Sequence, residues 1–379
     1  MTQSEIICSE LGEKFFGKDY VYENLKYFNE NNQKIELCDG LFEYADMYLA
    51  IQIKERSLQN GGKSHKDWLS SVVYGKAVQQ MIITVSTLTN RSININDLYH
   101  QNLKTNPNNI VYPMIIFDNI DVNDYKKIIR VGGLSIHIFS MEDYKNMMQV
   151  LIHPLDIFSY LEQRNDWLND GGALPKFAFG ESDDFSLVSS IDSEKDFARF
   201  YDLYTYGQNS STKMAALQLL SIITKFRDKQ ARKNKDYKQI LRILQLIDVG
   251  CAPAFMDRFN FAWKNSFEDR FDLTKAIMQI YQEKRVQIVF VSLGFTPLEK
   301  QEYYRIICDA KQLQHECEAV LIISFVGNNK DCNCFINWVY SEGKCEKSDD
   351  MFEKYKAVGM YDGTITRETF NMICALACP

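Results

Sequence analysis

Apolar and polar residues alternate most clearly over residues 36–56, which read ELCDGLFEYADMYLAIQIKER. Residues 41–44 and 47–53 are rich in apolar and aromatic side chains, and the dipeptide Ala45-Asp46 separates them. Runs of this kind are typical of β-strands, and a two-residue connection between them is typical of a tight hairpin turn. The pattern therefore predicts a β-hairpin near the beginning of the chain.

The two-residue turn predicts which residues of the hairpin face each other. Tyr44 pairs with Met47, and counting back along both strands places Asp39 directly opposite Gln52. Directly opposed residues lie on one face of the pair, with Cβ atoms roughly 5 Å apart. Side chains alternate along a strand, so Lys54 shares that face. An acid, an amide and an ammonium group are expected to converge on one patch.

The elements on either side of the hairpin predict an α/β order. Residues 9–28 read mainly as helix, and residues 68–88 read as a second helix capped by Asp67. The apolar runs at 110–117 and 133–139 are expected to be buried strands. Ser140 is expected to cap a helix at 141–151, and another helix follows at 154–168. This order predicts a mixed β-sheet flanked by helices.

A passage rich in Gly, Pro, Ser and Asp at residues 170–190 predicts a domain boundary. We place the first domain at 1–170, a linker at 171–195 and a C-terminal domain at 196–379. Residues 196–285 are expected to be mostly helical. Buried strands at 287–295 and 319–328 should flank a helix at 298–313, and residues 335–343 should form an edge strand. This small α/β region would suit target recognition or oligomerisation.

Composition and charge limit the class of protein. Hydrophobic residues make up 46% and charged residues 25% of the chain, as in ordinary globular proteins. The net charge of −7 argues against a protein that coats nucleic acid, but not against a nuclease, whose metal site needs carboxylates. No secretory signal or bilayer-spanning run is visible. We expect a cytoplasmic protein without membrane association, in which most of the ten cysteines are reduced.

The pattern of Asp39 followed by Gln52-Ile53-Lys54 resembles the core motif of the PD-(D/E)xK nuclease superfamily. Gln52 replaces the usual acid, and this Gln-x-Lys form resembles the Mrr-like branch of restriction endonucleases. The resemblance covers roughly the first 140 residues. It implies a restriction-endonuclease-like core and a metal-dependent endonuclease that hydrolyses phosphodiester bonds of DNA. It also implies a role in bacterial restriction or antiviral defence.

The same resemblance implies roles for the hairpin residues. Mg²⁺ or Mn²⁺ would be held by the Asp39 carboxylate, the Gln52 amide oxygen and the Ile53 carbonyl, because such cations prefer hard oxygen ligands. Lys54 would orient or deprotonate the attacking water and stabilise the developing charge. Because Gln52 brings no negative charge, a second interpretation stays open. In that interpretation the chain is a catalytically degenerate nuclease-fold protein that acts as a nucleic-acid-binding, sensor or scaffold component of a complex.

Two flanking helices are expected to contribute to the site by resemblance. In the family, a helix ahead of the hairpin often supplies an acid to the metal site. Glu13 is the residue we choose for this role, and Glu10 is the alternative. The helix after the Lys strand often contributes a Gln or Lys near the scissile phosphate, which Lys76 or Gln79 could do here. For each of these residues, a solvated helix face is the competing explanation.

A basic segment lies in the second half of the chain. Residues 225–242 hold eight Lys or Arg against two Asp. Lys229, Arg232, Lys233 and Lys235 could contact nucleic-acid phosphates, although a solvated connection between two helices explains the segment as well. The expected partner is double-stranded DNA, and the expected assembly is a homo-oligomer or a multi-protein defence complex.

Overall fold

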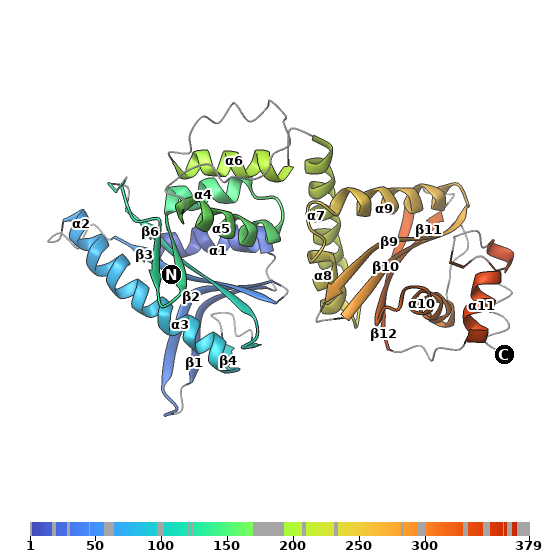
Figure 1. Cartoon of the computed structure of the whole chain (residues 1–379), viewed down its shortest axis with the longest axis horizontal. Helices are drawn as coiled ribbons and strands as arrows, with labels where there is room; N and C mark the ends of the chain where they lie inside the picture. Colours follow the sequence, from blue (N-terminus) through green and yellow to red (C-terminus); the bar gives the residue numbers. More distant parts are fainter. Residues whose placement is uncertain are drawn as a thin grey trace. The chain divides into compact units, whose positions relative to one another are not determined.

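The computed structural model divides the chain into two compact units, Met1–Gln208 and Asn209–Pro379. It describes the chain except for residues 1, 17–19, 29–30, 45, 57–63, 97–101, 120, 123, 170–192, 207–209, 231–233, 282–283, 295–300, 329–332, 344–348, 359, 362–365 and 370–379. Each unit is an α/β arrangement with its own sheet (Figure 1). Within the described residues, no helix has the length and apolar character needed to cross a membrane.

The N-terminal unit opens with a helix and three consecutive strands. In chain order its elements are α1 (Gln3–Phe16), β1 (Val21–Phe28), β2 (Lys34–Tyr44), β3 (Met47–Glu55), α2 (His65–Trp68), the π-helix η2 (Leu69–Ala77), α3 (Val78–Asn90), β4 (Asn94–Asn96), β5 (Asn102–Lys104), β6 (Ile110–Asp118), β7 (Ile128–Val131), β8 (Leu134–Ser140), α4 (Met141–Val150), α5 (Pro154–Asn169) and α6 (Glu194–Tyr206).

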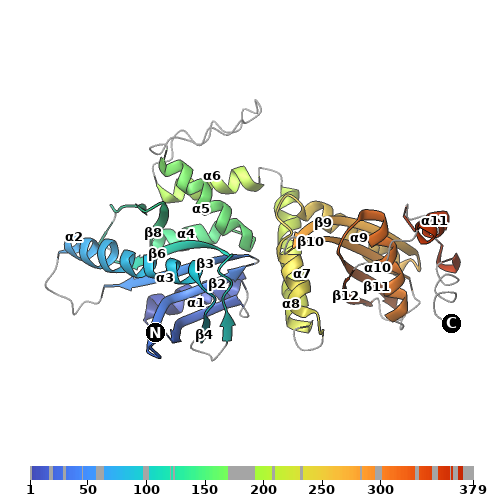
Figure 2. The same cartoon turned by 60° about the horizontal axis from the view of Figure 1, so that its bottom comes forward.

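The described strands of this unit form one mixed sheet in the order β5-β4-β1-β2-β3-β6-β8-β7. Strands β1, β2 and β3 are an antiparallel meander, whereas β6 runs parallel to β3 and β8 runs parallel to β6. Parallel neighbours need a long crossover, which α2, η2 and α3 provide between β3 and β6 (Figures 1 and 2). The expected mixed sheet between helices is confirmed at this level.

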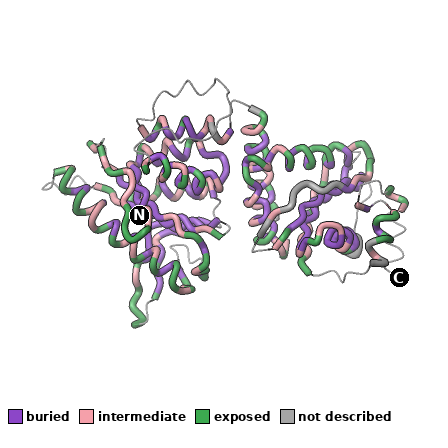
Figure 3. Tube along the Cα trace, in the orientation of Figure 1, coloured by how far each residue is buried: buried purple, intermediate pink, exposed green. Residues whose placement is uncertain are grey.

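Helices cover both faces of the central strands, which are buried along most of their length (Figure 3). On one face, η2 and α3 pack through Val73, Ala77 and Met81 onto a core that includes Leu41 and Ala50. On the other face, α1 and α5 bring aromatic rings against β2. Strands covered on both faces read as nearly continuous apolar runs, which explains the apolar character of the hairpin sequence.

The prediction of a helix over residues 9–28 is wrong in its second half, because β1 occupies Val21–Phe28. The apolar residues Leu25 and Phe28 are three apart, a spacing that favours a helix. In the structure, Asn24 has a positive φ of 47° and the register with β2 shifts between Leu25 and Lys26. This irregularity removes the period of two by which a strand is recognised in a sequence.

The helix after the hairpin begins earlier than expected. Ser64, rather than Asp67, is its N-cap, and the Ser64 hydroxyl accepts a hydrogen bond from the Asp67 backbone N–H. The expected buried stripe is present at Val73, Ala77 and Met81. Ser140 caps α4 as predicted, because its hydroxyl accepts from the Asp143 backbone N–H.

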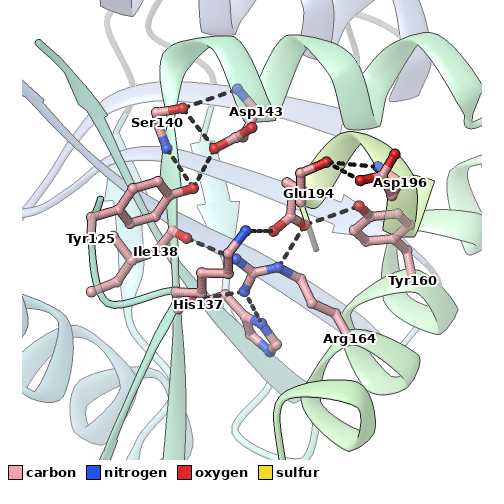
Figure 4. Close-up of polar contacts among 11 residues, drawn as sticks. Tyr125, His137, Ile138, Ser140, Asp143, Tyr160, Arg164, Glu194 and Asp196 are labelled. Atoms are coloured by element: carbon pink, nitrogen blue, oxygen red, sulfur yellow. Dashed lines mark hydrogen bonds and ion pairs between the residues drawn. The ribbon is translucent and has the colours of Figure 1, made fainter. Parts of the chain in front are cut away.

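A buried ion pair attaches α6 to the rest of the N-terminal unit (Figure 4). The Arg164 Nε on α5 lies 2.7 Å from Glu194 Oε1 on α6, and both side chains are fully buried. Arg164 also donates to the backbone carbonyls of Lys127 and Ile138, and Tyr160 donates to Glu194. The two units therefore divide after α6, whereas the sequence analysis placed residues 196–206 in the C-terminal domain. Residues 170–192 of the expected linker lie outside the described residues.

The C-terminal unit has three layers. Its described elements are α7 (Ser210–Gln230), α8 (Tyr237–Gln245), α9 (Ala252–Phe267), β9 (Phe271–Tyr281), β10 (Lys284–Leu293), α10 (Gln301–His315), β11 (Ala319–Asn328), β12 (Asn333–Glu342) and α11 (Asp349–Ala357). The sheet order is β12-β11-β10-β9, with β10 and β11 parallel. Helix α9 packs on one face through Phe255 and Phe259, and α10 packs on the other through Ile307.

The strand predictions for this unit are confirmed for β10, β11 and the edge strand β12. The expectation of helix up to residue 285 is wrong from residue 271, where β9 begins. The pairing of β9 with β10 is irregular between Gln287 and Val289, which face Met278 and Lys275. Because β9 has one more residue than β10 across this interval, its alternation changes phase in the middle of the strand.

Candidate active site

The β2–β3 hairpin has the predicted register. Tyr44 pairs with Met47, and the ladder continues to Gly40 opposite Ile51. The ladder ends before the next residue, Asp39, which contacts β3 through its side chain and not through its backbone. The Ile53 backbone N–H donates to the Asp39 carboxylate over 2.6 Å. This bond holds the carboxylate against β3 at Ile53, one residue beyond Gln52, which the turn predicts to lie opposite Asp39.

A β-bulge lies two residues before Asp39. The β1–β2 register shifts between Leu25 and Lys26, which leaves Leu37 as the extra residue on β2. The Thr84 hydroxyl of α3 donates to the Leu37 carbonyl. Bulges bend a strand and re-aim its side chains, and they are frequent beside active sites. The bulge and its contact with α3 therefore help to set the direction in which Asp39 projects.

Lys54 joins the two other side chains of the predicted patch. Its Nζ donates to Gln52 Oε1 over 3.0 Å and lies 3.7 Å from Asp39 Oδ2. Gln52 is buried, whereas the Lys54 side chain keeps 16% of its surface exposed. The structure thus brings the acid, the amide and the ammonium group together, with the amide oxygen of Gln52 turned toward the ammonium.

The Asp39 carboxyl has an unusual environment for an acid. Burial raises its pKa to about 6, against the lowering effects of the Lys54 charge and the Ile53 backbone N–H. The nearby carboxyl groups of Glu36 and Glu5 raise it further. A cation placed at this carboxylate would favour its ionised form. The site is therefore arranged so that positive charge, from Lys54 or a metal ion, is needed to keep Asp39 ionised at neutral pH.

A cavity lies beside Asp39, between α1 and the meander. Three of the residues around it carry carboxyl groups: Glu5, Glu23 and Asp39. The other residues that line it are Cys8, Ser9, Asn24, Gly40, Phe42, Ile51 and Ile53. Burial raises the pKa of the Cys8 thiol to about 12, so this cysteine is a neutral thiol and not a nucleophile at physiological pH.

The position of α1 decides which of its acids reaches the cavity. The Ser4 backbone N–H donates to Glu55 and the Ser4 hydroxyl donates to Asp118, which anchors the start of α1 at the ends of β3 and β6. At Gly12 the helix comes so close to β2 that an added Cβ would lie 2.4 Å from the Phe42 ring. These two contacts fix the helix along β2.

Glu5, and not Glu13, is the α1 acid beside the cavity. Glu13 is half-buried and follows Gly12, at the level of Phe42, so it is about two helical turns beyond Glu5. The alternative, Glu10, is exposed. The buried residues Ser4, Cys8, Gly12 and Phe16 recur every four positions, and this spacing of small residues was the available signal for the packed face of α1.

The other predicted contacts lie apart from the cavity. Lys76 and Gln79 are exposed on η2 and α3, and neither lines the cavity. Lys229 and Lys235 are exposed in the C-terminal unit. The two remaining predicted phosphate contacts, Arg232 and Lys233, lie outside the described residues.

The donor atoms beside Asp39 are oxygens, the ligand type that Mg²⁺ and Mn²⁺ prefer. Within the described part of the chain, no three His, Cys, Asp or Glu side chains are grouped so that they could hold a metal ion. Of the residues that the resemblance assigns to the metal, Asp39 and Ile53 line the cavity, together with the acids Glu5 and Glu23. Gln52 is not among the lining residues, and its amide oxygen accepts from Lys54. Mg²⁺ accepts few protein oxygens because it retains several waters. So few charged protein ligands would bind the divalent cation weakly.

Comparisons with protein-family models, curated proteins and solved structures found no match to this chain. Similarity to known proteins therefore assigns neither a family nor an activity. The contacts among Asp39, Gln52 and Lys54 are the features from which a function can be inferred.

Proposed function

We propose that the N-terminal unit is a metal-dependent endonuclease core that hydrolyses phosphodiester bonds of DNA. The observation that carries the proposal is the position of Lys54, whose ammonium lies between Asp39 and Gln52 where the β2–β3 ladder ends. The pair of Asp39 and Lys54 is largely buried, and charged groups beside a core cost free energy unless they are paired or used.

The order of elements supports the same proposal. A helix precedes a three-stranded antiparallel meander, a long helical crossover follows, and β6 then lies parallel to β3. This is the order that a restriction-endonuclease-like core requires, and it puts Asp39 and Lys54 on its second and third strands. The proposed fold and the proposed site are thus mutually consistent.

Each residue has a defined task in the proposed reaction. A bound divalent cation would supply Lewis-acid stabilisation of the phosphate and its attacking water. Asp39 would hold that cation, with its carboxylate oriented by the Ile53 N–H. The Lys54 ammonium donates hydrogen bonds and is positively charged, so it would stabilise the charge that develops on the phosphate. Gln52 orients Lys54 through its amide oxygen.

One observation favours the degenerate-core alternative. The Gln52 oxygen, which a metal would need, is already an acceptor for Lys54. Asp39 is the one carboxylate in direct contact with this pair among the described residues, and its pKa is raised by burial. Such a core would bind nucleic acid without cutting it.

Cleavage assays separate these possibilities. The purified full chain is incubated with plasmid, linear duplex, single-stranded DNA and RNA, each with Mg²⁺, Mn²⁺ or EDTA. We expect cleavage of duplex DNA with Mn²⁺ or Mg²⁺ and none with EDTA. Lys54→Ala should abolish it in a protein that stays folded by circular dichroism, and Lys34→Ala, at the exposed start of β2, should not. A protein that cleaves no substrate with either metal, or a Lys54→Ala variant that cleaves fully, would refute the proposal.

A further inference from the structure

Exposed lysines gather where α7 ends and α8 begins. Lys225 and Lys229 lie one turn apart on α7, Lys235 precedes α8, and Lys238 is its second residue. We call these four side chains the α7–α8 lysine patch. All four are exposed, and none of them forms an ion pair with any other described residue. Of the two acids nearby, Asp228 is paired with Arg227.

The backbone under the patch is held in place by aromatic contacts. The Phe226 and Tyr237 rings are stacked, with centroids 5.7 Å apart. Phe226 also contacts the Trp338 ring of β12, and the Asn234 side-chain amide donates to the Trp338 carbonyl over 3.0 Å. Helices α7 and α8 lie side by side in both views (Figures 1 and 2). Since Lys225 and Lys238 are the sequence neighbours of the stacked rings, the patch sits on a fixed support.

Helix stability does not account for the charges of the patch. A cation in the last turn of a helix is favourable, which explains Lys229 at the end of α7. A cation at a helix N-terminus is unfavourable for the same reason, yet Lys235 and Lys238 lie there, and the first turn of α8 contains no acid. The N-cap residue Asp236 makes no capping hydrogen bond with its side chain. The chain has a net charge of −7, yet Lys235 and Lys238 lie at a helix N-terminus, where the helix dipole disfavours positive charge.

We propose that the α7–α8 lysine patch binds the phosphate backbone of duplex DNA without reading its sequence. Four exposed ammonium groups without ion pairs among the described residues are complementary in charge to the phosphates of a duplex. An anionic membrane would also attract them. The choice of DNA rests on the proposed function, because the same chain carries the candidate phosphodiester site. Lysine point charges make no bidentate contact with base edges, so binding depends on charge alone.

The test is a binding measurement that does not depend on cleavage. Fluorescence anisotropy of a labelled duplex is recorded in EDTA with the full chain, over a series of salt concentrations. The test variant is Lys229→Gln/Lys238→Gln. Its matched control is Lys354→Gln/Lys356→Gln, which removes two exposed lysines of α11 in the same unit. Four phosphate contacts give a slope of log K against log salt of about −3.6, and the test variant should reduce it to about −1.8.

The expected result is weaker binding of the test variant to two duplexes of unrelated sequence, by the same factor, with the control equal to the wild type and all three proteins melting at the same temperature. The inference is overturned if the test variant binds like the wild type, if the control loses as much affinity, or if the wild type binds no duplex. It is also overturned if the patch governs binding to phosphatidylserine vesicles and not to DNA. A protein that binds through the patch but never cleaves would refute the proposed function alone.

Discussion

Gln52 is the residue at which the two proposed activities diverge. Its side chain is buried and its amide oxygen accepts a hydrogen bond from Lys54 over 3.0 Å. An oxygen in this position can be shared with a cation, whereas the NH₂ end points away from the ammonium because both are donors. The charge at this position is therefore the property to vary.

Gln52→Glu should raise the affinity for Mn²⁺, because a second carboxylate would lie within a few ångströms of the cation, where screening by water is weak. In EDTA the buried charge should lower the free energy of unfolding by about 1–3 kcal/mol, and Mn²⁺ should restore it. The measurement is melting temperature against Mn²⁺ concentration. Gln52→Met, which keeps the volume but removes the oxygen, should lose the response to Mn²⁺. An unchanged Mn²⁺ response in Gln52→Glu would favour the degenerate core.

The positions of some residues of the candidate site can be predicted from the sequence alone, whereas the positions of others cannot. Asp39, Gln52 and Lys54 meet because a two-residue turn and the period of a strand are local properties. Glu5 reaches the cavity because Ser4 is held by Glu55 and Asp118, which lie 51 and 114 residues away along the chain. Contacts of that range leave no local pattern, so Glu13 was an equally reasonable choice from the sequence.

At the scale of elements, α3 supports the bulged part of β2. The Thr84 hydroxyl donates to the Leu37 carbonyl and also to the Gln80 carbonyl of its own helix. Thr84 is buried, so no water replaces its hydroxyl if it is removed. The contact links the crossover helix to the strand that carries Asp39.

Thr84→Val should lower the free energy of unfolding by about 1–2 kcal/mol, because the shape is kept while a buried carbonyl loses its donor. Activity should fall more than stability predicts, since the bulge directs Asp39. The checks are the urea midpoint and the cleavage rate. Thr89→Val is the matched control: its hydroxyl donates to a carbonyl of the same helix, but it is exposed, and both quantities should stay near the wild-type values. Equal behaviour of the two variants would show that the Leu37 contact is unimportant.

Strand β8 carries a buried histidine that resists protonation. Burial, followed by the charges of Arg164 and Arg130, lowers the pKa of His137 well below its usual value. Its Nδ1 lies 3.1 Å from the Arg164 guanidinium, which can only donate. Arg164 is in turn paired with the buried Glu194 carboxylate, which also pairs with the Lys127 ammonium.

The unfolded chain therefore binds a proton at His137 below about pH 6.5 that the folded chain does not bind. Stability should fall as pH decreases from 6.5 to 5, by at most about 1.4 kcal/mol per pH unit from this group. His137→Asn keeps an acceptor for Arg164 but does not titrate, so its free energy of unfolding should change less over this interval. Denaturant titrations at pH 7 and 5 measure the difference. Identical pH dependence in both proteins would contradict the assignment.

Element types followed from the sequence where the strand or helical pattern was unbroken, as in β3, α5 and the part of β2 after its bulge, or where an apolar run was continuous, as in β6. They failed at β1, where Asn24 has a positive φ of 47°, and at β9, which contains the extra residue of its bulge. The short strands β4, β5 and β7 were not predicted. The extra residue in β9 moves its apolar positions from one parity to the other, so the strand presents neither a clear period of two nor a clear helical period.

At the scale of the whole molecule, the ion pair of Arg164 and Glu194 decides where the first unit ends. Burial alone would raise the pKa of Glu194, but Arg164 and Lys127 hold it below its usual value. Helix α6 also stacks the Phe197 ring on Trp167 of α5, with centroids 4.7 Å apart. The sequence indicated a boundary through composition, but it gave no sign that the helix beyond residues 170–192 returns to the first unit.

A fragment of residues 1–208 should therefore unfold cooperatively, and a fragment of residues 1–170 should be less stable by at least about 3–5 kcal/mol, the typical cost of leaving one member of a buried ion pair without its partner. The shorter fragment loses Glu194 and leaves Arg164, which is fully buried in the whole chain, without its partner. Urea unfolding monitored by circular dichroism measures both fragments. Glu194→Ala in the longer fragment removes the ion pair but keeps the aromatic packing of α6. This substitution should reproduce most of the difference in unfolding free energy between the two fragments. If the two fragments unfold at the same urea concentration, α6 does not stabilise the first unit, and the domain boundary lies at residue 170.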